Sequence, residues 1–168
     1  MRVGIGYDIH RLTEGRRLVL GGVEIPSVVG LDGHSDADVL THAVIDALLG
    51  AAAAGDIGSR FGTDAPWTRD LQSLRLLEDA VAAVADVGYA VTNADVTVVA
   101  EAPRLQPHLP AIRANLARAL RVAEGQVSVK GTTAKLMGLL GAGEGIAALA
   151  VVSLLPALPP AERPHPGA

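Results

Sequence analysis

The chain has 168 residues, 49% of them hydrophobic, 19% charged and only 2% aromatic, so a single globular domain must build its core from thin aliphatic side chains. The sequence contains no cysteine, which excludes disulfides, thiolate metal sites and a cysteine nucleophile. A net charge of −4 without runs of basic residues argues against a nucleic-acid partner.

Strand and helix patterns alternate along the chain. Short segments rich in β-branched residues predict strands at 2–8, 18–20, 23–25, 89–101, 126–130 and 146–155. Apolar residues at helical spacing predict helices at 35–54, 71–87 and 111–122, with a helical turn at 133–137. Glycine, proline and polar residues predict loops at 28–33, 56–70, 103–110 and 138–145.

This order of elements predicts a single α/β (α+β) domain over residues 1–155, with about four long strands in one sheet and helices on one face. Residues 156–168 contain five prolines and no apolar periodicity, so we expect a disordered tail there. No apolar stretch approaches the ~20 residues that cross a bilayer, and the N-terminus lacks the apolar region of a signal peptide. We therefore expect a cytoplasmic protein with no membrane partner.

Two histidines and a carboxylate are placed to form a metal site. Asp8 and His10 stand two residues apart at the end of the first predicted strand, so their side chains share a face. His42 lies in the first long predicted helix, with Asp38 and Asp46 one turn away on either side. Packing of strand on helix would give two imidazoles, one carboxylate and an open fourth position, as in catalytic zinc sites. Asp38 or Asp46 would then fix the tautomer of His42. The alternative is that His42 is an ordinary core or surface histidine and Asp8 a loop cap.

A candidate phosphate site precedes the same helix, at Gly33-His34-Ser35-Asp36. A helix N-terminus offers free backbone N–H groups and a positive dipole end, which suit an anion. His34 and Ser35 could orient or protonate that anion. The alternative is an ordinary Ser/Asp helix cap beside a solvated histidine.

A second candidate phosphate site combines Thr132 and Thr133 with Lys130 and Lys135, which are the only two lysines of the chain. Two hydroxyls and two ammonium groups near the start of a helical turn suit a phosphate, and a Ser/Thr-type cap is the alternative. Dinucleotide and P-loop motifs are absent, because neither the third glycine of the first nor the glycine loop of the second is present. No serine lies in a nucleophile-elbow motif.

Taken together, these segments resemble the 2-C-methyl-D-erythritol 2,4-cyclodiphosphate synthase family. The matching stretches occur in the family's order and spacing over nearly the whole chain to about residue 155. They are GYDIHRL (6–12), GHSDADVLTHAVIDALLGAAAAGDIG (33–58), NADVTVVAEAPRLQPH (93–108), VSVKGTT (127–133) and GAGEGIA (141–147).

The resemblance implies a homotrimeric phosphorus–oxygen lyase with active sites between neighbouring subunits. It implies that Asp8, His10 and His42 hold Zn²⁺ or a similar divalent ion. The implied reaction is intramolecular: the 2-phosphate of 4-diphosphocytidyl-2-C-methyl-D-erythritol 2-phosphate attacks the β-phosphorus and expels CMP. Such a reaction requires positioning and charge neutralisation rather than a protein nucleophile.

The resemblance also assigns roles to individual positions. His34 and Thr133 would stabilise the transition state. The erythritol part would contact Asp56, Gly58, Phe61, Gly62, Thr63, Asp64 and Ala65, and Ser35 would bind substrate phosphate. The cytidine diphosphate pocket would be lined by Ala100, Pro103, Arg104, Leu105 and Thr132.

Two departures from the family pattern bear on chemistry. Lys135 stands where the family has a Glu that holds Mg²⁺ or Mn²⁺ on the diphosphate, and a lysine would neutralise the diphosphate directly instead. Ala142 stands where the family has an arginine facing a central trimer cavity, so we expect weak or no binding of an isoprenoid diphosphate there. These changes leave two alternative functions open. The chain could be a divergent relative that acts on an altered substrate, or a catalytically silent trimeric protein that binds a metal or nucleotide.

Overall fold

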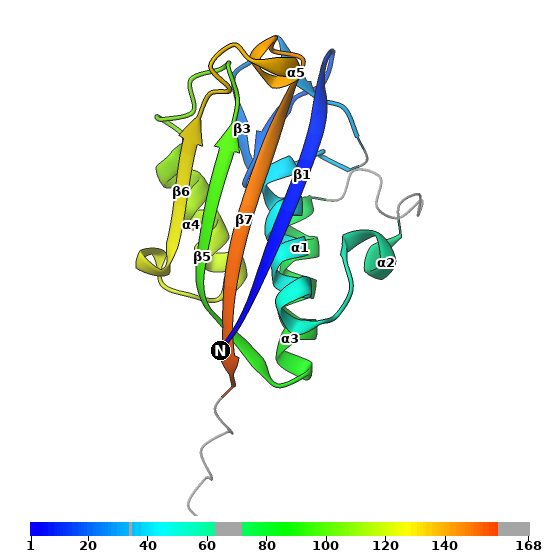
Figure 1. Cartoon of the computed structure of the whole chain (residues 1–168), viewed down its shortest axis with the longest axis vertical. Coiled ribbons are helices and arrows are strands. Elements are labelled where there is room, and N and C mark those ends of the chain that lie inside the picture. The colour runs from blue at the N-terminus through cyan, green and yellow to red at the C-terminus, as the bar shows by residue number, and fades with distance from the viewer. Residues whose placement is uncertain (34, 63–71, 158–168) are drawn as a thin grey trace, which may run out of the picture.

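A twisted five-stranded sheet organises the chain (Figure 1). The computed structural model describes residues 1–33, 35–62 and 72–157. Within them the strand order is β4-β1-β7-β5-β6. The strands are β1 (Arg2–Glu14), β4 (Val29–Leu31), β5 (Tyr89–Val99), β6 (Val127–Thr132) and β7 (Gly145–Pro156). Among these described strands only β5 and β6 run parallel, and a short hairpin of β2 (Leu18–Leu20) and β3 (Val23–Ile25) forms a separate two-stranded sheet.

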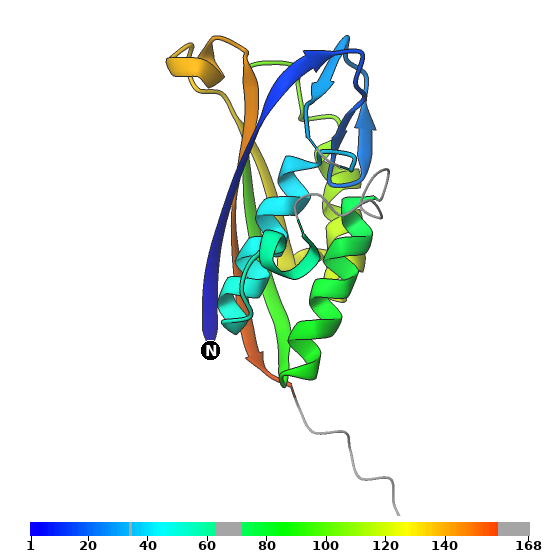
Figure 2. The same ribbon diagram turned by 90° about the vertical axis from the view of Figure 1, so that its right-hand side faces the viewer.

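Among the described residues, the long helices cover one face of the sheet and leave the other face bare (Figure 2). The long helices are α1 (Val39–Ala52), α3 (Ser73–Asp86) and α4 (Leu109–Leu120). Shorter ones are α2 (Ile57–Phe61), the 3-10 turn η2 (Glu124–Gln126) and α5 (Gly138–Gly141), which overhangs the bare face (Figure 2). None of the helices in the described ranges is long and apolar enough to cross a membrane.

Small residues bring α1 unusually close to β1. A Cβ atom built on Gly4 would lie 2.1 Å from the Ala47 carbonyl oxygen, and one on Gly6 would lie 2.0 Å from that of Ala43. Both distances are far below ordinary contact, so only glycine permits this approach. The thin core predicted from composition therefore sets the spacing between the strand that carries Asp8 and the helix that carries His42.

The predicted fold class is confirmed, and several element boundaries are corrected. The sheet has five strands, because β4 lies in the predicted 28–33 loop, and β1 continues to Glu14 rather than ending at residue 8. Two further helices, α2 and α5, lie in segments predicted as loops. Strand β7 extends to Pro156, into the predicted tail, and residues 158–168 lie outside the described residues.

The largest correction concerns the start of α1, which begins at Val39 rather than at residue 35 or 36. Ser35 and Ala37 adopt left-handed backbone conformations, with φ of 56° and 52°, which end any helical run. Asp38 is the N-cap, and its carboxylate accepts the Thr41 N–H. Ser35 and Asp36 therefore precede α1 instead of forming its first turn, and the phosphate-binding role of the 33–36 segment stays a prediction.

Candidate metal centre and active site

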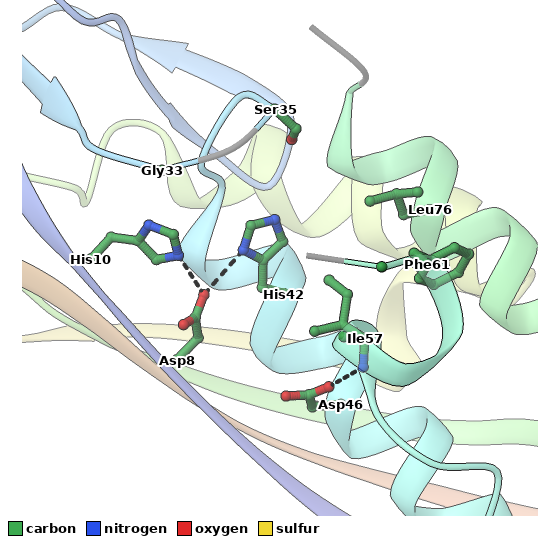
Figure 3. A pocket seen from close by; sticks show the side chains of 11 residues that line it. Asp8, His10, Gly33, Ser35, His42, Asp46, Ile57, Phe61 and Leu76 are labelled. Carbon is green, nitrogen blue, oxygen red and sulfur yellow. Dashed lines mark hydrogen bonds and ion pairs between the residues drawn. The ribbon is translucent and has the colours of Figure 1, made fainter. Parts of the chain in front are cut away.

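Asp8, His10 and His42 converge as the sequence predicts (Figure 3). Asp8 and His10 point from β1 toward the helical layer, and His42 projects from the first turn of α1. Asp8 Oδ2 lies 2.9 Å from His10 Nε2 and 3.1 Å from His42 Nδ1. One ligand atom from each residue lies within 4.8 Å of the other two, which is close enough for all three to hold one metal ion.

The three side chains are electrostatically coupled. Burial alone would raise the pKa of Asp8, but hydrogen bonds with His10 and His42 outweigh it and hold that pKa well below its usual range. Burial opposes protonation of His10, yet its hydrogen bonds to the Asp8 carboxylate and the Asp32 carbonyl raise its pKa above the ordinary value. Asp8 is therefore held in the carboxylate form, which is the form that binds a metal ion.

Each imidazole has a protein partner on the nitrogen that faces away from Asp8. His10 Nδ1 lies 2.6 Å from the carbonyl oxygen of Asp32, and His42 Nε2 lies 2.9 Å from Ser73 Oγ. These partners leave His10 Nε2 and His42 Nδ1, the two nitrogens nearest Asp8 Oδ2, as the atoms that could bind a shared ion. Neither partner followed from sequence spacing, since Ser73 is 31 residues from His42 and the Asp32 group belongs to the backbone.

The structure does not place Asp38 or Asp46 behind His42, where the sequence predicted them. Asp38 is fully buried and accepts the N–H groups of Gly21 and Gly22 as well as the Thr41 N–H and hydroxyl. Asp46 accepts the Ile57 N–H at 2.8 Å (Figure 3) and so connects α1 to α2. Asp38 therefore joins the β2–β3 turn to the start of α1. Ser73 is the residue that hydrogen-bonds to His42, the contact that the sequence predicted for Asp38 or Asp46.

A cavity of about 230 Å³ opens beside the three ligands. Carboxylate and imidazole groups form one wall, and apolar groups of Ile57, Phe61 and Leu76 form the other (Figure 3). The remaining lining residues are Gly33, Ser35, Asp46, Gly58 and Gly62. Four positions that the family resemblance assigns to substrate (Ser35, Gly58, Phe61 and Gly62) thus border the metal cluster.

A second cavity, of about 310 Å³, lies where the parallel strands β5 and β6 end. Carboxyl ends of parallel strands are frequent ligand sites because both chains leave the sheet there. All five positions of the predicted cytidine diphosphate pocket line it: Ala100, Pro103, Arg104, Leu105 and Thr132. Thr133, which the resemblance assigns to transition-state stabilisation, lines it as well. Glu101 also lines it, which the sequence did not predict, and its carboxylate accepts the Leu136 N–H at 3.1 Å.

Other predicted site residues lie elsewhere. Asp56 caps α2 by accepting the Ser59 N–H at 2.7 Å, and Lys135, in a left-handed conformation with φ of 56°, does not line the second cavity. His34, Thr63, Asp64 and Ala65 lie outside the described residues. Their roles stay predictions.

This chain is similar to known proteins over almost its whole length. The chain is 57% identical to the 2-C-methyl-D-erythritol 2,4-cyclodiphosphate synthase of Syntrophomonas wolfei, over 90% of this chain and 97% of that protein. The solved IspF–CDP complex from Plasmodium falciparum is 33% identical with a TM-score of 0.81, covering 94% of this chain and 97% of that one. The bifunctional IspDF of Campylobacter jejuni is 38% identical with a TM-score of 0.88, and the match covers 91% of this chain and 42% of that longer one.

The fold and the site define a class: a mixed sheet covered by helices on one face, with a two-histidine, one-carboxylate cluster at the edge of a cavity. The YgbB family model matches residues 1–155. The chain belongs to the YgbB family, and its relatives are 2-C-methyl-D-erythritol 2,4-cyclodiphosphate synthases.

Proposed function

We propose that this chain converts 4-diphosphocytidyl-2-C-methyl-D-erythritol 2-phosphate to 2-C-methyl-D-erythritol 2,4-cyclodiphosphate with release of CMP, in isoprenoid precursor biosynthesis. The observation that carries the proposal is the open Asp8–His10–His42 cluster beside a cavity, in a chain 57% identical to a synthase of that name. In this reaction an oxygen of the 2-phosphate bonds to the β-phosphorus, and the bond from that phosphorus to the CMP oxygen breaks. The enzyme is then a phosphorus–oxygen lyase.

The donor set suits a zinc-type ion. One carboxylate oxygen and two imidazole nitrogens are ligands that Zn²⁺ accepts, and three protein ligands leave a position for substrate. Bound there, the ion would act as a Lewis acid on a phosphate oxygen. Asp8 would contribute negative charge, and with the ion bound His10 Nε2 and His42 Nδ1 would each direct a lone pair toward it.

The rest of the catalytic effect would come from positioning. The apolar wall of Ile57, Phe61 and Leu76 suits the carbon skeleton of the substrate, and Ser35 offers a hydroxyl to a phosphate. In the second cavity, Arg104 and the hydroxyls of Thr132 and Thr133 suit a diphosphate. Holding the 2-phosphate and the diphosphate in the reactive orientation would lower the entropic part of the barrier to attack on the β-phosphorus.

We propose that the chain acts as a homotrimer. The two cavities share no lining residue, which is consistent with an active site that two neighbouring subunits assemble, each supplying one of the cavities. The bare face of the sheet exposes large apolar side chains, including Ile5, Tyr7, Leu149 and Val151, and exposed patches of this kind mark interfaces. Ile5 pairs with Val151, and Tyr7 with Leu149, so they form a continuous surface.

A matched pair of lysine substitutions tests the trimer. Ile5 is 71% exposed on the bare sheet face, and Val87 is 55% exposed at the end of α3. Ile5→Lys should yield a folded monomer without activity, because a charge in an apolar interface is costly. Val87→Lys should remain trimeric and active. Sedimentation velocity would reject the proposal if both variants, or neither, changed the association state.

Turnover of the cytidyl substrate tests the activity itself. Phosphorus NMR should show the cyclic diphosphate and CMP appearing in equal amounts with wild-type protein. His42→Ala should retain the fold and lose both metal binding and turnover. CMP binding without turnover would instead favour a catalytically silent nucleotide-binding protein, and turnover of a different substrate would favour a divergent relative. A cytoplasmic location stays a prediction.

A further inference from the structure

The hydroxyl of Ser73 lies between the His42 imidazole and the Asp36 carboxylate and contacts both. Ser73 is the first residue of α3, its side chain is fully buried, and its Oγ lies 2.9 Å from His42 Nε2. The Asp36 carboxylate accepts two hydrogen bonds from Ser73. Its Oδ1 accepts the Ser73 hydroxyl, and its Oδ2 accepts the Ser73 backbone N–H at 3.1 Å. Ser73 therefore connects a metal-ligand candidate to a carboxylate on a different segment.

The direction of this hydrogen-bond chain follows from counting protons. A carboxylate can only accept, and a serine hydroxyl has one proton to donate. Because that proton goes to Asp36, Ser73 Oγ is an acceptor toward His42. His42 Nε2 must then carry the hydrogen, which leaves Nδ1 with the lone pair that a metal requires. His42 Nδ1 is the nitrogen that faces Asp8, at 3.1 Å.

His10 shows the complementary arrangement. Its Nδ1 lies 2.6 Å from the Asp32 carbonyl oxygen, which can only accept, so Nε2 is left for a ligand bond. The two rings thus use opposite nitrogens as ligands, and each has a separate acceptor behind it. Without Ser73, the His42 Nε2–H would lose the acceptor that fixes this tautomer.

We infer that Ser73, oriented by Asp36, is a positioning residue that fixes the tautomer and ring orientation of His42 for metal binding. The inference rests on the proposed metal centre and adds to it a residue that touches neither substrate nor metal. Partners behind metal-ligating histidines typically change metal affinity by about 10–100-fold when removed. Asp36 also accepts the Ser35 hydroxyl at 3.0 Å, so the same carboxylate orders a residue that lines the metal cavity.

Zinc affinity of the full-length chain, measured by competition with a chromophoric chelator, tests the inference. Ser73→Ala should weaken Zn²⁺ binding about 10–100-fold and change the visible spectrum of the Co²⁺-substituted protein. At saturating metal it should keep most of its kcat. Asp36→Asn should also weaken Zn²⁺ binding, by a smaller factor. If Ser73→Ala does not fold, the Zn²⁺ affinity of Asp36→Asn tests the inference in its place.

Thr41→Val is the matched control. Thr41 is also fully buried, is adjacent to His42, and donates its hydroxyl to Asp38 rather than to the metal cluster. This variant should lose stability and keep wild-type Zn²⁺ affinity and Co²⁺ spectrum. Equal losses in Thr41→Val and Ser73→Ala, or unchanged affinity in Ser73→Ala, would overturn the inference. Failure of the wild-type chain to bind either metal would instead refute the proposed metal centre.

Discussion

The close approach of β1 to α1 makes Gly6→Ala a severe change. The added Cβ would lie 2.0 Å from the Ala43 carbonyl oxygen and 2.7 Å from the Ala47 nitrogen, whereas ordinary contact begins at 3.4 Å. Both obstacles are backbone atoms, so no side chain can rotate away, and α1 must move back by about 1.4 Å. Overpacking of this kind costs about 1–3 kcal/mol, and we expect the upper end.

The displacement of α1 away from β1 would also change the geometry of the Asp8–His10–His42 cluster. Asp8 is the next residue on the inward side of β1 after Gly6, and His42 immediately precedes Ala43 on α1. A retreat of α1 would therefore widen the 3.1 Å separation of Asp8 Oδ2 from His42 Nδ1 by a similar amount. Metal–ligand distances tolerate only about 0.2 Å, so Zn²⁺ affinity and turnover should each fall by roughly 100-fold.

Gly50→Ala is the control for this experiment. Gly50 lies in the same helix, and a Cβ built on it meets nothing within 4 Å. Alanine exceeds glycine in helix propensity by about 1 kcal/mol, so this variant should be stabilised and bind Zn²⁺ normally. Urea unfolding and zinc titration of both variants decide the matter. Wild-type stability and wild-type affinity in Gly6→Ala would refute this account of the β1–α1 packing.

Three further predictions concern separate parts of the site. Asp38→Ala leaves four donors without their acceptor, and three of them are buried: the Gly21 N–H and both donors of Thr41. At about 1 kcal/mol for each buried donor, the variant should lose roughly 3 kcal/mol in urea unfolding, and a loss below about 1 kcal/mol would contradict this. Wild-type turnover should persist without Mg²⁺, because Lys135 supplies a positive charge, whereas Lys135→Glu should make turnover depend on Mg²⁺; strict Mg²⁺ dependence of the wild type would count against this role. Zinc at 1,000 times its Kd should add about 4 kcal/mol of stability, so chelation should lower Tm by roughly 8–16 °C in calorimetry, and an unchanged Tm would mean that no tight site exists.

The Asp8–His10–His42 cluster was predictable because local periodicity determines it. Alternation along a strand places Asp8 and His10 on one face whatever the rest of the chain does. The apolar spacing of α1 correctly identified the helix that carries His42. What remained to be assumed was that this strand and this helix pack together, and the glycines of β1 allow that contact.

The residues behind the ligands were not predictable in the same way. Asp38 and His42 are four residues apart, which on a helix would place them on one face, but α1 begins only after Asp38. Left-handed backbone at Ser35 and Ala37, which no propensity favours, turns the chain so that Asp38 faces the β2–β3 hairpin. Ser73 reaches His42 through the docking of α3, a contact between segments with no shared sequence pattern.

The distribution of small and large residues on β1 supports the proposed trimer more strongly than composition does. In a monomer, the larger apolar side chains should face the helices and the smaller ones the solvent. Strand β1 has the reverse order, with Gly4 and Gly6 facing α1, and Ile5 and Tyr7 exposed. Strand β7 shows the same reversed order at 148–151, where the two alanines are buried and Leu149 and Val151 are exposed. This order becomes favourable when another subunit covers the exposed face, as in the proposed trimer. The low aromatic content would then reflect two close packings: α1 on β1 within the chain, and sheet on sheet between the proposed subunits.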